Sequence, residues 1–156
     1  MANLIASDSH LTEEQSRTLR LVQNLLIPAD IDRGMPGAGE LDFIGYVSEF
    51  ASGSMNAITA ELDKIIDASE NRHGAKFAEL ASNEQQELLE QLESSQPHFA
   101  VNLQVQTLSC YYQDDSVMEA LGMEARPPFP EGNKVVSGDL SLLDPVRNRG
   151  KIYRDA

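Results

Sequence analysis

The feature that most constrains the fold is a change in sequence character at Gly122. Before this glycine, apolar residues recur with the spacing of amphipathic helices, and capping residues separate the segments. Strand patterns are nearly absent, since only Lys134–Ser137 resembles a strand and it is too short to build a sheet. We therefore expect an all-α protein with a bundle-like domain of six to seven helices.

The predicted helices follow from apolar spacing and capping residues. They are expected from Thr12 to the residue before Pro28, over 40–51, over 54–68, around 77–80, from Ser82 onward, over 95–112 and over 116–121. Thr12 and Gln15 have the spacing of a capping box, and Ser82 and Gln85 repeat it. Ser95 and Pro97 fit the N-cap and first-turn positions of the 95–112 helix, the longest one expected.

Residues 123–156 show neither helical nor strand periodicity and are rich in Pro and Gly. They nevertheless keep large apolar side chains such as Phe129, Leu140 and Ile152, whereas disordered tails are poor in such residues. Each of these side chains costs roughly 1.5–3 kcal/mol if it stays in water. The predicted organisation is a flexible N-terminus over 1–11, a helical body over 12–122, and an extended arm over 123–156 that docks on the body and on a partner.

Charge and composition exclude several classes of function. Residues 1–123 carry 6 Lys and Arg against 20 Asp and Glu, and residues 124–156 carry 6 against 5. An acidic body is a poor ligand for nucleic acid, because affinity for phosphates comes from clustered Lys and Arg. No apolar stretch approaches the roughly 20 residues that cross a bilayer, so direct membrane insertion is not expected.

Familiar catalytic, cofactor and metal patterns are missing from the sequence. Gly34, Gly37 and Gly39 follow a predicted helix and lack dinucleotide-binding spacing, so we interpret them as a structural turn. The three histidines lack the i, i+4 spacing of a helix-borne metal site. The single cysteine, Cys110, is expected to be a buried and unreactive thiol. We predict no catalytic, cofactor-binding or metal-binding residue in this chain.

Candidate partner contacts are instead predicted at the end of the last long helix and in the arm. Tyr111 and Tyr112 either anchor the helix end in the core or supply an interface, since tyrosine offers large, rigid contact area. Arg147, Arg149, Lys151 and Arg154 form a basic cluster that contacts either the acidic body or an acidic partner. The residues predicted at the interface are Tyr111, Tyr112, Leu142, Leu143, Pro145, Arg147 and Tyr153.

Four segments in order resemble the gluconate 2-dehydrogenase subunit 3 family. They are LIPAD at 26–30 with PGA at 36–38, ELDFI at 40–44, YYQD at 111–114 with the following Leu121-Gly122, and LLDPVR at 142–147. No single motif is specific, but together they span nearly the whole chain, from about Leu19 to Tyr153.

The resemblance implies a non-catalytic small subunit that stabilises a large flavoprotein and assists its folding or export. That partner would be an FAD-binding sugar dehydrogenase of the glucose–methanol–choline type, active on gluconate or glucosides and carrying the catalytic histidine. A cytochrome or another electron acceptor would be a further partner. The alternatives are a homo-oligomeric interaction module without a flavoprotein and a stand-alone small enzyme.

The N-terminus departs from many members of that family. It has no twin arginine and no basic region followed by an apolar run. As written, the sequence predicts a cytoplasmic location. A periplasmic location is expected if a signal was removed or is supplied by another subunit.

Overall fold

The computed structural model describes residues 11–126, 132 and 136–149. The chain divides into two units, residues 1–125 and 126–156. The described residues contain seven α-helices and no β-strand, as predicted. The helices are α1 (Glu13–Leu26), α2 (Phe43–Phe50), α3 (Met55–His73), α4 (Ser82–Ser95), α5 (Val101–Tyr111), α6 (Asp115–Ala120) and α7 (Asp144–Arg147). Short 3₁₀ helices cover Ile31–Arg33, Ala38–Glu40, Ser52–Ser54, Phe77–Glu79 and Leu140–Leu143.

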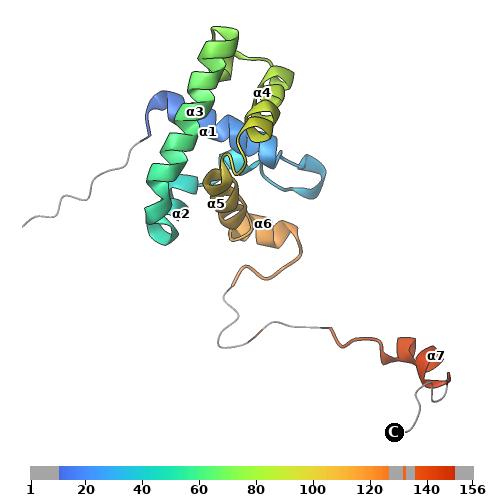
Figure 1. Cartoon of the computed structure of the whole chain (residues 1–156). Coiled ribbons are helices and arrows are strands. Elements are labelled where there is room, and N and C mark those ends of the chain that lie inside the picture. Colours follow the sequence, from blue (N-terminus) through green and yellow to red (C-terminus); the bar gives the residue numbers. More distant parts are fainter. Residues whose placement is uncertain (1–10, 127–131, 133–135, 150–156) are drawn as a thin grey trace, which may run out of the picture. The chain divides into compact units, whose positions relative to one another are not determined.

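In the first unit, α3 packs against α1, α4 and α5. Figure 1 shows α3 running along the length of this unit, with α4 beside its C-terminal part and α5 nearer its N-terminal part. The most deeply buried side chains of the core include Ile58, Leu62 and Ile65 of α3 and Leu103 of α5, none of which is exposed. Truncating one such leucine or isoleucine to alanine costs roughly 2–5 kcal/mol, so this helix contact contributes substantially to the stability of the unit.

Two predicted helix starts have different outcomes. The capping box of α1 is confirmed: the Thr12 hydroxyl accepts from the Gln15 backbone at 3.1 Å, and the Gln15 side chain accepts from the Thr12 backbone at 2.9 Å. The box predicted at Ser82 and Gln85 is wrong by one residue. The Glu84 carboxylate accepts from the backbone N–H of Ala81 at 2.9 Å, and the Gln85 amide is buried and donates to the Phe77 carbonyl.

The predicted 95–112 helix is wrong, because the chain turns between α4 and α5. Gln96 is extended (φ −131°, ψ 95°), as a residue before proline prefers, and Ser95 is the last residue of α4 rather than a cap. His98 (φ 68°) and Ala100 (φ 53°) then adopt left-handed conformations that complete the turn. The longest helix is therefore α3, which continues beyond the predicted end at residue 68 to His73 and stops at Gly74 (φ 65°).

The segment between α1 and α2 folds back on α1. The backbone N–H of Gly39 donates to the Asn24 side chain at 2.9 Å. A Cβ at position 39 would lie 2.4 Å from the Arg20 carbonyl oxygen, so this close approach requires glycine. Ala38 is buried there against Tyr111 and Val117 in a second, smaller apolar cluster. The glycine-containing loop thus positions the C-terminal end of α5.

The described part of the second unit contains a short helical segment within the predicted irregular arm. The Asp139 carboxylate accepts from the Ser141 backbone at 3.0 Å and caps the 3₁₀ turn Leu140–Leu143. Pro145 occupies the first turn of α7, where its missing N–H needs no partner. Apolar spacing does not reveal these two short turns, because each is only four residues long.

Candidate partner interface

The two adjacent tyrosines predicted as partner contacts lie in different environments. Tyr111 is 1% exposed, and its hydroxyl donates to the Pro36 carbonyl at 2.9 Å, so it anchors the end of α5 inside the unit. Tyr112 is 53% exposed, and its ring meets that of Tyr111 edge to face at 5.3 Å. Of this pair, only Tyr112 offers side-chain area to a partner.

The arm residues predicted at the interface are exposed within their own unit. Leu142 is 74% exposed, and Leu143 and Pro145 are also exposed. The Arg147 guanidinium lies 3.4 Å from the Asp144 carboxylate, an exposed pair of the kind that contributes little to stability. Tyr153 lies outside the described residues. The interface role of these side chains stays a prediction.

The structure reveals an apolar stripe on α5 that sequence analysis missed. Val101, Val105 and Leu108 recur at i, i+4 and i+7 and therefore share one helix face, and Tyr112, the C-cap residue directly after the helix, continues this spacing at i+11. All four are exposed, with Val105 at 49% and Leu108 at 47%. The opposite side of α5 packs into the core through Leu103, Thr107 and Cys110. Apolar residues thus occupy both sides of this helix, whereas a helix in a solvated surface normally has one polar side.

The sequence carries a second signal at the same place. The run from Ser94 to Gln113 contains no Asp, Glu, Lys or Arg, in a chain that has 12 Lys and Arg and 25 Asp and Glu. Depletion of charge with retained apolar and aromatic residues is typical of the centre of a protein–protein interface. The exposed face of α5, defined here by Val101, Val105, Leu108 and Tyr112, is therefore the best candidate interface of the first unit.

A buried carboxylate holds the N-terminus of α5 in place. Ala100 precedes the helix and has no side chain that could cap it. Glu61 of α3 supplies the missing acceptor: its carboxylate accepts from the backbone N–H of Asn102 at 3.2 Å, from that of Leu103 at 2.8 Å and from the Asn102 side chain at 3.0 Å. A negative charge at this end also suits the helix dipole. Glu61 thus fixes both the start and the direction of α5.

Polar contacts along α5 complete its attachment. The buried Gln23 amide of α1 donates to the Thr107 hydroxyl at 3.4 Å, and the Tyr46 hydroxyl of α2 donates to the Gln106 side chain at 3.4 Å. Three neighbouring helices therefore hold α5, so that its apolar face is presented on a rigid support. Pre-organisation of this kind lowers the entropic cost of binding a partner.

The single cysteine is buried in the core, as expected. Burial raises the pKa of the Cys110 thiol from 9.0 to about 11, and the carboxylates of Asp114 and Asp42 act in the same direction. Because the thiolate is the nucleophile and the metal ligand, this thiol is poorly suited to either role.

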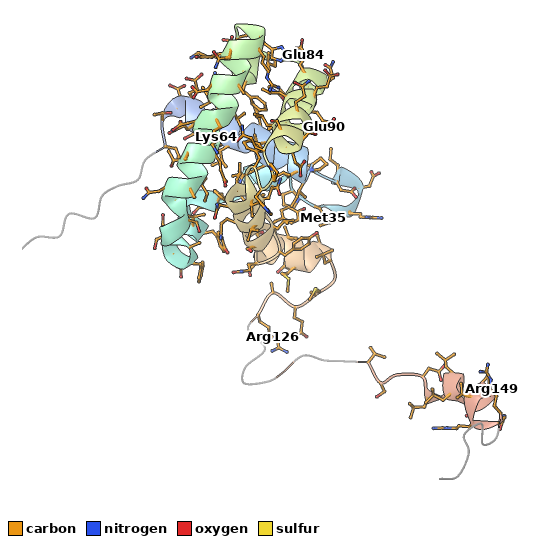
Figure 2. All side chains as sticks on the ribbon, viewed as in Figure 1. Met35, Lys64, Glu84, Glu90, Arg126 and Arg149 are labelled. Carbon is orange, nitrogen blue, oxygen red and sulfur yellow. The ribbon has the colours of Figure 1, made fainter. Side chains whose placement is uncertain are left out.

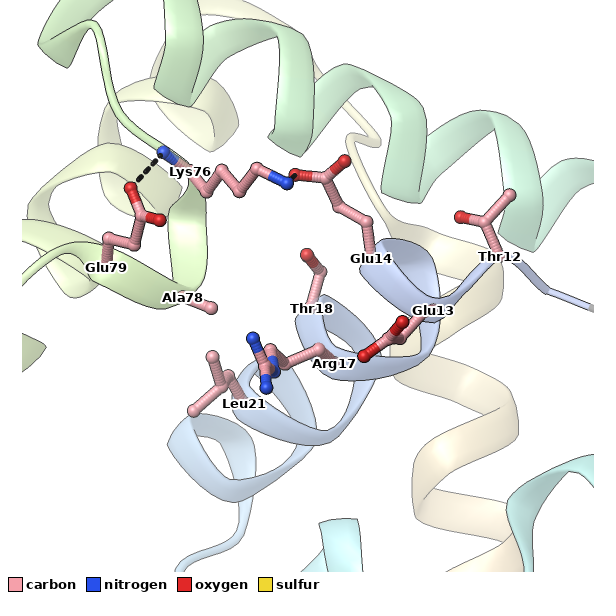
Figure 3. A pocket seen from close by; sticks show the side chains of 9 residues that line it. All are labelled: Thr12, Glu13, Glu14, Arg17, Thr18, Leu21, Lys76, Ala78 and Glu79. Carbon is pink, nitrogen blue, oxygen red and sulfur yellow. Dashed lines mark hydrogen bonds and ion pairs between the residues drawn. The ribbon is translucent and has the colours of Figure 1, made fainter.

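An open groove of about 640 Å³ lies between the start of α1 and the turn after α3. Figure 3 shows the Lys76 side chain extended toward Glu14, with its Nζ 3.6 Å from the Glu14 Oε1. Glu79 also accepts from the Lys76 backbone at 3.3 Å. The Glu14–Lys76 pair thus joins α1 to the Phe77–Glu79 turn, and Glu79 stabilises the turn itself, so both carboxylates have a structural role.

The part of the chain that the structure describes contains no cluster of three or more His, Cys, Asp or Glu side chains with metal-binding geometry. No helix within it is both long and apolar enough to span a bilayer.

The described residues thus define a small all-α protein whose candidate site is an apolar helix face suited to a protein partner. The sequence profile of a known family, gluconate 2-dehydrogenase subunit 3, matches residues 13–126, which confirms the suspected resemblance. The chain belongs to this family and is related to the small subunits of a multi-subunit dehydrogenase. Comparisons with curated proteins and with solved structures gave no match.

Proposed function

We propose that this chain is the non-catalytic small subunit of an FAD-dependent sugar dehydrogenase of the gluconate or glucoside type. In this proposal it binds the large flavoprotein subunit, stabilises it and assists its folding or export. FAD and the catalytic groups belong to the large subunit, which is of the glucose–methanol–choline type, and a cytochrome or another electron acceptor takes up the electrons.

The observation that carries the proposal is the exposed, charge-free face of α5 on a chain of this family. Full burial of one large aliphatic side chain is worth roughly 1.5–3 kcal/mol. Val105 and Leu108 are about half exposed and Val101 is 38% exposed, so covering them contributes roughly 1 kcal/mol apiece. Tyr112 adds a rigid aromatic ring of the kind enriched at binding hot spots. A large subunit that covers this face would gain stability from the contact.

Co-expression with the cognate large subunit tests the proposal. We expect affinity-tagged small subunit to co-purify with a large subunit that contains FAD. The double variant V105E/L108E places two charges in the proposed contact and should lower the co-purified flavoprotein by at least about tenfold, because buried unpaired charges are costly. Flavin absorbance of the eluate measures the effect.

A matched control is I31E, which also replaces an exposed aliphatic side chain by glutamate but lies outside α5. It should leave the yield of complex unchanged. Equal losses for both variants would contradict the assignment of the α5 face. A wild-type chain that retains no flavoprotein would contradict the function itself.

The alternative is self-association, in which a second copy covers the same face of α5. Sedimentation of the pure chain distinguishes the two. A dimer that V105E/L108E dissociates, together with no binding of the large subunit, would favour the homo-oligomeric module.

A further inference from the structure

A hollow of about 200 Å³ lies between α1, α4 and α5. Its wall is largely apolar and comes from all three helices. The apolar lining residues are Val22, Leu25, Leu26, Leu89, Phe99 and Leu103. Leu26 is partly exposed at its edge, so the hollow opens to the surface of the unit.

The size of the hollow limits what it can hold. Sites for cofactors and drug-sized molecules usually measure about 300–1,000 Å³ and place several polar groups around the ligand. A hollow of about 200 Å³ with this lining matches one large apolar side chain better than a cofactor.

One rim of the hollow is acidic. Glu90 and Glu93 of α4 both line it, and they share a helix face because they are three residues apart. Glu90, labelled on α4 in Figure 2, accepts from the neutral Gln86 amide at 2.9 Å. Within residues 11–126, neither glutamate forms an ion pair with a Lys or Arg. The rim therefore offers two carboxylates to a cation.

The hollow adjoins the candidate interface. Gln104 of α5 lines the hollow, and Val101 and Leu108 are its neighbours at i−3 and i+4 on the same helix. A partner that covers the exposed face of α5 thus reaches the hollow without crossing another element.

We propose that the hollow receives an apolar side chain of the large flavoprotein subunit, next to a Lys or Arg that pairs with Glu90 and Glu93. This inference rests on the proposed function and adds the chemistry of the segment that is bound. Apolar burial supplies affinity, and the two carboxylates select a basic segment and speed association.

The test uses the full-length chain and the purified large FAD subunit, whose dissociation constant is measured at low and high salt. The variant E90Q/E93Q keeps the side-chain shape and removes both charges. We expect it to bind about tenfold more weakly at low salt, which corresponds to two moderately strong ion pairs, and to lose most of the salt dependence. The control D67N/E70Q neutralises an i, i+3 acidic pair exposed on α3 and should match the wild type.

A photoreactive side chain at position 26, on the rim, provides a second measurement. Cross-linking to a peptide of the large subunit that contains a large apolar residue beside Lys or Arg supports the inference. If E90Q/E93Q binds like the wild type with unchanged salt dependence, or the cross-linked peptide lacks a basic residue, the inference is wrong while the proposed function stands. If the wild-type chain does not bind the large subunit at all, both are wrong.

Discussion

Cys110 and Tyr111 place two ionisable groups in the buried side of α5. Burial is the main cause that raises the pKa of the Cys110 thiol to about 11. Burial also raises the pKa of the Tyr111 phenol, and nearby Tyr112, Asp30 and Asp114 act in the same direction. Both groups are neutral when protonated, so the folded chain retains protons that the unfolded chain releases. These residues make the fold sensitive to high pH.

The free energy of unfolding should therefore fall as the pH rises from about 9, the pKa of the Cys110 thiol in the unfolded chain, to about 11, its pKa in the folded chain. The contribution of Cys110 is fully present below about pH 9 and is lost as the pH approaches about 11, because the unfolded chain then binds fewer protons. We predict that the free energy of unfolding decreases more between about pH 8 and about pH 10.5 in the wild type than in C110A. Urea denaturation at both pH values measures this difference.

Other titrating groups are common to both proteins, so C110A serves as the control for them. Equal losses of unfolding free energy in the wild type and in C110A would contradict the assignment of this pH dependence to Cys110.

The wild-type thiol should also react slowly with a thiol reagent near neutral pH until the chain is unfolded, because its thiolate is scarce in the folded state.

Among the helices, the sequence predicted the start of α1, whose capping contacts join residues close together in the chain. Thr12 and Gln15 are close in sequence, and the capping box that they form was predictable. The start of α5 was not predictable, because the carboxylate that caps it belongs to Glu61 of α3, which is 41 residues before Asn102 in the sequence. His98 and Ala100 also adopt left-handed conformations, which are unfavourable for residues other than glycine and were therefore not predicted. The charge-free run from Ser94 to Gln113 was visible in the sequence, but only the structure shows which of its apolar residues are exposed.

The dependence of α5 on Glu61 leads to a stability prediction. E61A leaves the buried backbone N–H of Leu103, the partly buried backbone N–H of Asn102 and the Asn102 side chain without their acceptor. Loss of hydrogen bonds to a charged group and the resulting unsatisfied donors should cost about 2–4 kcal/mol. Urea denaturation of the purified chain measures the change in the free energy of unfolding.

Two further variants control this measurement. E61Q retains one side-chain acceptor and should lose less stability than E61A. E70A removes an exposed glutamate from the same helix and should change stability by no more than about 0.5 kcal/mol. If E61A were as stable as the wild type, the carboxylate would not be what holds α5.

The molecule exposes two apolar surfaces that a partner can bind. The first is the exposed face of α5 with the adjoining hollow, and the second is the helical segment Leu140–Arg147 of the arm. The arm segment exposes Leu140, Leu142 and Val146 within its own unit. The two surfaces belong to different units of the chain. A large partner that contacts both surfaces binds more tightly, because effective concentration strengthens each of two linked contacts.

Deletion of residues 138–156 should therefore weaken the complex without unfolding the first unit. That unit has its own apolar core, and the core residues that the structure describes all lie at or before residue 117. We expect the truncated chain to keep its helical circular dichroism and its thermal transition, while the yield of co-purified flavoprotein falls by at least about tenfold, as loss of one of two linked contacts implies. Combining the deletion with V105E/L108E should abolish the complex, because both surfaces are then lost. An undiminished yield of complex from the truncated chain would show that the arm does not bind the large subunit.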